Sequence, residues 1–154
     1  MLSSGEDPRF ICRRLAILAS EDVGLASPQA LQMAAAAWTI TERIGMPECQ
    51  LTLSELVLYL ATCPKSDSSA QAIWTAMKDV SESRSQAVPL DLRSGPNPTH
   101  GSPAKNYVNP HRDPEHAPDQ DYLSSPRSYF TPGTSGFEAE VSRRLEQSDT
   151  DEPS

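Results

Sequence analysis

The sequence predicts an all-α fold, with a compact bundle of about four helices followed by a Pro-rich extended tail and a short C-terminal helix. Apolar residues recur at helical spacing through the first half of the chain, and β-rich windows are nearly absent there. Nine of the fourteen prolines lie between Pro89 and Pro132, and only four lie before Ser83. The first part is therefore expected to be globular and the rest loop-rich.

The first helix is predicted to start with Asp7 as its N-cap and Pro8 at the first helical position. Gly24 suits the position just beyond its end, where a glycine tolerates the left-handed backbone. Three apolar residues line one face of this helix: Ile11, Leu15 and Leu18.

The second helix is expected to start with Ser27 as cap and Pro28 at the first position, and to end at Gly45. Arg43 then places a cation at the helix C-terminus, where the helix dipole favours it. Its apolar face is predicted to consist of Leu31, Ala34, Ala35 and Trp38. The alanine run from Ala34 to Ala37 would let a neighbouring helix approach closely.

Two more helices complete the predicted bundle. The third starts near Thr52 or Ser54 and stops before Pro64, since proline disfavours helix at the preceding residue. Its apolar face comprises Leu53, Leu56, Val57 and Leu60. The fourth follows Ser69 and presents Ala70, Ile73, Trp74 and Met77 at i, i+3, i+4 and i+7.

These segments predict four regions in the chain. Residues 1–93 form the helical domain, 94–132 a Pro-rich tail that packs on the bundle, 133–147 a short helix, and 148–154 a disordered acidic end. Within the tail, spaced apolar side chains are candidate anchors onto a surface: Tyr107, Tyr122, Leu123, Tyr129 and Phe130. The short helix carries Phe137, Val141 and Leu145 on one face.

Composition excludes several functions. The net charge is −8, from 13 basic and 21 acidic residues. This negative electrostatic field argues against direct binding of this chain to nucleic acid, whose phosphates are also negative. Cys12, Cys49 and Cys63 form no CxxC pair and are expected to be reduced thiols. No apolar run approaches the length of a membrane span, and no signal peptide is visible. The protein is therefore expected to be cytoplasmic.

The acidic pair Glu21-Asp22 could be catalytic, could bind a metal, or could form a corner between two helices. Adjacent helical residues point about 100° apart, so the two carboxylates do not converge without outside help. A structural role at the corner is favoured. Arg13 and Arg14 have no acidic residue at i±4, which makes a tertiary or inter-subunit pair with Glu21 or Asp22 a reasonable hypothesis.

No enzyme site is predicted. His111 and His116 lie close to Asp113 and Glu115, but the intervening prolines keep the segment extended and no cysteine is near, so no metal site is expected. Nothing resembles a Walker A, GxGxxG, HExxH or GxSxG motif. We expect no catalytic, cofactor-binding or metal-binding residue in this chain.

The stretch "GEDPRFICRRLAILASEDVGLASPQAL", with "ERIGMPE", "YLATCPKS" and "VPLDLR" after it, resembles the C-terminal region of the RarA/MgsA family of replication-associated AAA+ ATPases. "YVNPHRDPEH", "RSYFTP" and "GFEAEVSRRLE" resemble the weaker tail motifs of that family. The resemblance covers nearly the whole chain. The signature residues that it implies for structure and interfaces are Asp7, Pro8, Arg13, Arg14, Glu21, Asp22, Gly24, Pro28, Arg43, Gly45, Pro47, Pro64, Lys65 and Ser66.

The resemblance implies a C-terminal oligomerisation domain that forms homotetramers in a DNA-dependent ATPase acting at stalled replication forks, in DNA repair and recombination. It also implies single-stranded DNA-binding protein and fork DNA as partners of the full-length protein, and a nucleoid-associated location. The ATP and Mg²⁺ sites of the family lie upstream, so this chain is expected to be N-terminally truncated. The alternative is an orphan helical protein-binding module or a truncated remnant without ATPase activity.

Overall fold

The computed structural model describes residues 1–82, 86–89, 92, 107–109, 111–113, 122–123 and 125–150. All regular structure in these residues is helical, so the predicted all-α class is confirmed. Within the same residues, no helix combines the length and the apolar character needed to cross a membrane. The chain divides into two compact units, one formed by Met1–Met77 with Tyr129–Ser154 and the other by Lys78–Ser128.

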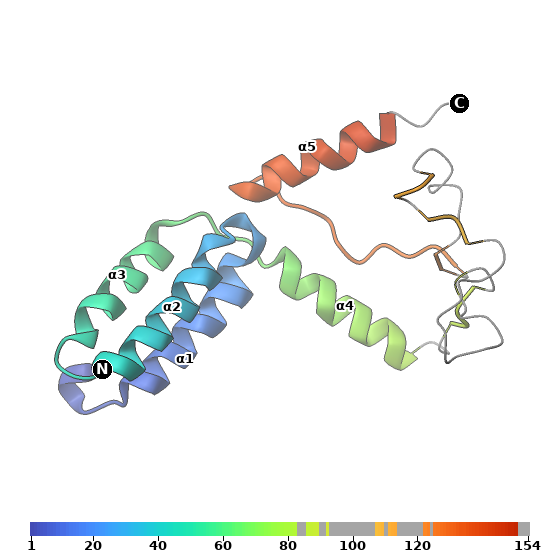
Figure 1. Ribbon diagram of the computed structural model, residues 1–154. Helices are drawn as coiled ribbons and strands as arrows, with labels where there is room; N and C mark the ends of the chain where they lie inside the picture. The colour runs from blue at the N-terminus through green and yellow to red at the C-terminus, as the bar shows by residue number, and fades with distance from the viewer. Residues whose placement is uncertain are drawn as a thin grey trace. The chain divides into compact units, whose positions relative to one another are not determined.

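Three helices form the bundle of the first unit: α1 (Pro8–Leu18), α2 (Gln29–Ile44) and α3 (Cys49–Thr62). A short 3-10 turn, η1 (Leu2–Ser4), precedes α1. Helix α2 packs against both α1 and α3, and these two also contact each other (Figure 1). Each helix therefore buries one face against two neighbours.

Helix α1 starts as predicted, because the Asp7 side chain accepts a hydrogen bond from the backbone N–H of Arg9 at 2.8 Å and Pro8 is the first helical residue. Beyond Leu18 the helix continues into a π-helical turn, η2 (Ala19–Val23), and a 3-10 turn, η3 (Gly24–Ala26). Gly24 ends the π turn with a φ of +51°, in agreement with the prediction that a glycine closes this segment.

The predicted start and face of α2 are partly wrong. Ser27 makes no capping hydrogen bond to the helix, and Pro28 occupies the N-cap position. The buried residues of α2 are Ala30, Ala34, Ala37 and Thr41, whereas Leu31 and Ala35 are exposed. The small side chains let α1 and α3 both approach α2 closely, so the alanines mark the core and the larger Leu31 turns outward.

Helix α3 starts at Cys49, three residues before the predicted Thr52. Leu53, Leu56 and Leu60 are buried as expected, but Val57 is exposed. Of the predicted face of α4 (Ser68–Glu82), only Ala70 is buried. Helix α5 (Phe137–Thr150) starts later than the predicted residue 133 and ends three residues beyond residue 147, and residues 151–154 lie outside the described part.

The core of the first unit consists of two clusters of buried side chains. One joins the end of α1 and its π turn to α2 and α3, and its members are Ala19, Val23, Ala30, Ala34, Ala37, Leu56 and Leu60. The other joins the starts of α1 and α3 through Ile11, Cys12, Cys49 and Leu53. All three cysteines are free, as predicted.

Candidate interaction surface

The corner between α1 and α2 is held by buried apolar residues and leaves its acidic pair in solvent. Ala19 and Val23, on the π turn, are buried, whereas Glu21 and Asp22 are exposed. A β-carbon on Gly24 would lie 2.6 Å from the backbone oxygen of Ser66. Only glycine therefore permits this approach of the corner to the segment that joins α3 and α4.

That joining segment contains the signature residues Pro64, Lys65 and Ser66. The backbone N–H of Ser66 donates to the backbone oxygen of Val23 at 3.3 Å. Lys65 donates to backbone oxygens at the end of α3, at 3.2 and 3.3 Å. Two signature stretches that are about forty residues apart in sequence thus meet in space, and their contact stabilises the corner between α1 and α2.

Three further signature residues lie at or just beyond the end of α2. Arg43 lies in the last turn of α2, and Gly45 ends that helix with a φ of +68°. Pro47 follows a cis peptide bond in the turn before α3. These positions match the helix-ending roles that the sequence predicts for Arg43 and Gly45.

The two arginines and the two acids of the opening stretch do not pair within the described chain. Arg13, Arg14, Glu21 and Asp22 are all exposed, and none of the ion pairs among the described residues involves them. The intrachain form of the predicted pair is therefore absent from the described part, and the inter-subunit form stays a prediction. Arg13 and Glu21 do share one feature, because both line the same groove.

The groove between α1, α2 and α4 has a volume of about 610 Å³. Among the described residues, Arg13 and Glu21 are the charged members of its lining, and the others are Ala16, Ile17, Ser20, Leu31, Trp38, Ala70 and Ile73. A second groove of about 520 Å³ shares Ser20 and Leu31 with the first and is lined on one side by Phe130. Linings of this kind bind apolar side chains and offer little acid–base chemistry.

Sequence reasoning missed Glu138, in the first turn of α5, which is the most deeply buried charged side chain among the residues that the structure describes. It has no exposed surface and accepts three hydrogen bonds. An acidic residue in a first helical turn is ordinarily explained by its own helix dipole. The local pattern therefore held no signal for partners that lie seventy residues away.

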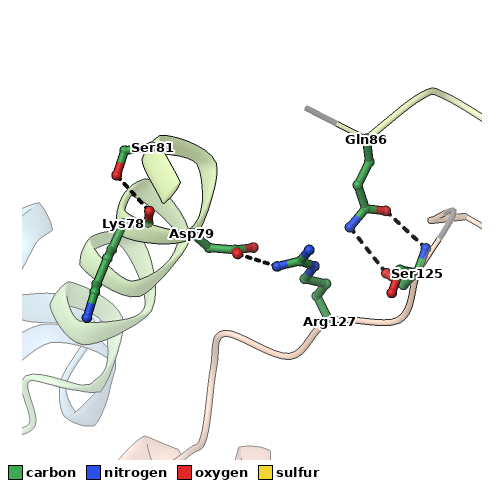
Figure 2. Close-up of polar contacts among 6 residues, drawn as sticks. All are labelled: Lys78, Asp79, Ser81, Gln86, Ser125 and Arg127. Atoms are coloured by element: carbon green, nitrogen blue, oxygen red, sulfur yellow. Dashed lines mark hydrogen bonds and ion pairs between the residues drawn. The ribbon is translucent and has the colours of Figure 1, made fainter. Parts of the chain in front are cut away.

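The second unit contains polar contacts that link residues 125–127 to the end of α4 and to Gln86, which follows that helix (Figure 2). The Gln86 side-chain amide exchanges hydrogen bonds with the backbone of Ser125, at 3.0 and 3.4 Å. Arg127 forms an ion pair with Asp79 near the end of α4. The end of α4 and Gln86 thus contact residues 125–127, which lie within the predicted Pro-rich tail.

No group of three potential metal ligands occurs among the residues that the structure describes. The backbone N–H of His111 donates to the Asn109 side chain at 2.9 Å. The potential ligands His116 and Glu115, which are close to His111 and Asp113 in the sequence, lie outside the described residues.

Comparison with known proteins defines the class. The family described as MgsA AAA+ ATPase C terminal matches residues 1–149. The chain belongs to this family, and its relatives match it in their C-terminal part.

Three relatives illustrate the similarity. An uncharacterized AAA domain-containing protein of Mycobacterium tuberculosis is 43% identical over 96% of this chain and 34% of its own length. Replication-associated recombination protein A of Coxiella burnetii is 36% identical over 95% of this chain and 34% of its own length. The protein of the same name from Escherichia coli K12 is 38% identical over 62% of this chain and 22% of its own length. The chain thus spans about a third or less of these relatives.

Proposed function

We propose that this chain is the oligomerisation domain of a RarA/MgsA-like AAA+ ATPase that acts in DNA replication, recombination and repair at stalled forks. The observation that carries the proposal is the family match over residues 1–149, with relatives named replication-associated recombination protein A. ATP and Mg²⁺ would bind outside these residues. Single-stranded DNA-binding protein and fork DNA would be partners of the longer protein, in a cytoplasmic, nucleoid-associated setting.

The surface of the first unit supports a self-association role. Leu31, Ile73, Trp74 and Met77 each expose roughly half or more of their surface, and Leu31 and Ile73 line the same groove. Contiguous exposed apolar surface on a small domain marks an interaction site. Burying it against further copies of the chain would remove this apolar area from water, which favours a closed symmetric assembly.

The test is the molar mass of the purified chain, measured by light scattering after gel filtration over a range of concentrations. The wild type is expected to run as a tetramer. We call Leu31, Ile73, Trp74 and Met77 the apolar patch. Ile73→Glu places a charge in this patch and should yield a monomer with unchanged helical content. Thr75→Glu is the control, since Thr75 lies about 200° around α4 from Ile73 and carries the same charge change outside the patch.

A wild-type chain that is monomeric at all concentrations would contradict tetramerisation and favour the alternative of an orphan protein-binding module or remnant. The replication role has a separate test. Deleting the encoding gene should sensitise cells to agents that stall forks, and a variant confined to the α4 patch should reproduce that phenotype if assembly is required.

A further inference from the structure

The side chain of Glu138 is fully buried at the start of α5, and it is the one charged side chain in the buried class among the described residues. Removing a carboxylate from water is costly unless hydrogen-bond donors replace the lost hydration. No cation pairs with it in the described part of the chain. The buried carboxylate of Glu138 is therefore stabilised by uncharged hydrogen-bond donors.

Three donors surround the Glu138 carboxylate. The backbone N–H of Gly133 and the hydroxyl of Ser66 donate to Oε2, at 2.6 and 3.0 Å. The hydroxyl of Ser68 donates to Oε1 at 2.5 Å. Hydrogen bonds to an ionised acceptor are shorter and roughly twice as strong as neutral ones, so this cradle offsets much of the burial cost.

The cradle lies at the start of α4. Ser68 is the first residue of that helix, and its backbone N–H donates to the Ser66 hydroxyl at 3.2 Å. A helix N-terminus has unpaired N–H groups and a partial positive charge, which a carboxylate stabilises. Glu138 of α5 thus contacts the N-terminus of another helix through the Ser66 and Ser68 hydroxyls, across 70 residues of sequence in the case of Ser68.

The backbone approaches closely at the same place. Gly136, with a φ of +57°, lies just before α5, and a β-carbon there would be 2.1 Å from the Ala26 backbone oxygen and 2.9 Å from Pro64. The segment leading into α5 therefore contacts both the α1–α2 corner and the α3–α4 connection. Three parts of the chain therefore meet at the start of α5.

Phe130 precedes this junction by eight residues and lines the second groove with Leu25, Pro28 and Ala72. The segment from Phe130 to Glu138, here called the strap, thus has an apolar contact at one end and a hydrogen-bonded carboxylate at the other. While Glu138 holds the strap, Phe130 forms one wall of that groove.

We propose that Glu138 is a latch that makes docking of the strap and α5, and ordering of the first turn of α4, a single cooperative event. Release of the carboxylate leaves Ser66 and Ser68 without their acceptor and frees Phe130 from the groove. The groove next to the apolar patch therefore opens or closes with the latch. The proposal does not depend on the oligomeric state.

Amide hydrogen exchange of the full chain, followed by mass spectrometry, tests the coupling because local opening sets exchange rates in each segment. Glu138→Ala should accelerate exchange about tenfold or more, both in α5 and in the first turn of α4, because the lost contacts join the two. Glu138→Gln should have a smaller effect, since the amide oxygen still accepts from Gly133 and the amide N–H can donate to a serine hydroxyl.

Glu140→Ala is the matched control. Glu140 lies in the same helix, and its ion pairs among the described residues are with Arg143 and Arg144 on α5 itself. Its loss should change exchange in α5 and leave the first turn of α4 as in the wild type. Acceleration confined to α5 in Glu138→Ala would overturn the proposal, as would no acceleration in either segment.

Ser68→Ala keeps the proposal testable if Glu138→Ala does not fold. This variant removes one donor, leaves the carboxylate with two, and should accelerate exchange in both α5 and the start of α4. A change confined to α4 would show that Ser68 acts only within its own helix and would contradict the latch.

Sodium formate supplies a free carboxylate to Glu138→Ala, and it should slow exchange in both segments more than sodium chloride at the same ionic strength. Equal effects of the two salts would also count against the cradle.

Discussion

The hydroxyl of Tyr59 in α3 shares a hydrogen bond of 2.6 Å with the hydroxyl of Ser27, the residue that precedes α2. The serine that was expected to cap its own helix instead ties the α1–α2 corner to a helix thirty-two residues further on. This contact fixes the corner from the α3 side, whereas Gly24 and Ser66 fix it from the side of the α3–α4 connection.

Tyr59→Phe removes this hydrogen bond with little change in shape. The free energy of unfolding should fall by about 1 kcal/mol, the usual net value of such a bond. Urea denaturation followed by circular dichroism measures it. Tyr107→Phe, at an exposed tyrosine of the other unit, is the control and should change stability by less than about 0.5 kcal/mol. Equal losses in the two variants would contradict the role of the Tyr59 hydroxyl.

Gly24→Ala tests the close approach at the corner. Alanine would be strained at the φ of +51°, and its β-carbon would meet the Ser66 backbone oxygen at 2.6 Å. Gly5→Ala isolates the conformational part, because Gly5 also has a positive φ but has nothing within 4 Å of the added carbon. Gly5→Ala should cost about 1–2 kcal/mol, and Gly24→Ala distinctly more in the same denaturation experiment. A similar cost for both would mean that the corner relaxes without penalty.

Leu56→Ala tests where the core lies. Leu56 is fully buried in the cluster that joins α2 and α3, so truncation should leave a cavity and cost about 2–5 kcal/mol. Leu58, two residues away, exposes 63% of its surface, and Leu58→Ala should cost less than about 1 kcal/mol. Thermal and urea unfolding of both variants measures the difference. A larger loss for Leu58→Ala would show that the face of α3 has been assigned incorrectly.

Thr41→Val is expected to stabilise the chain. Thr41 is buried in α2, and its hydroxyl has no hydrogen-bond partner within the described structure. Valine has nearly the same shape and lacks the unsatisfied hydroxyl, so unfolding should require roughly 1 kcal/mol more free energy. The matched control is Thr39→Val, because the exposed Thr39 hydroxyl already donates to the Ala35 backbone oxygen at 3.1 Å. Destabilisation by Thr41→Val would indicate a partner for that hydroxyl, such as buried water.

Much of the candidate surface was accessible from local pattern. Arg13 and Glu21 are among the signature residues that the sequence indicates, and both line the first groove. Their expected pairing does not form in the described chain, where both side chains are exposed. Leu31 was assigned to the core, and it instead forms the edge shared by the two grooves.

The sequence by itself determined the all-α class, the start of α1 at Asp7 and Pro8, the glycine ends at Gly24 and Gly45, and the family. The class and the helix ends depend on interactions within one or two helical turns, which periodicity and capping residues record directly, whereas the family was indicated by the resemblance of whole motifs. Tertiary structure alone decided which face of α2 is buried, which partner Ser27 takes, and where Glu138 lies. The face of α2 depends on its packing between α1 and α3, and the other two outcomes depend on hydrogen bonds between residues 32 and 72 positions apart. Chain folding brings such residues together without leaving a periodic trace in either segment.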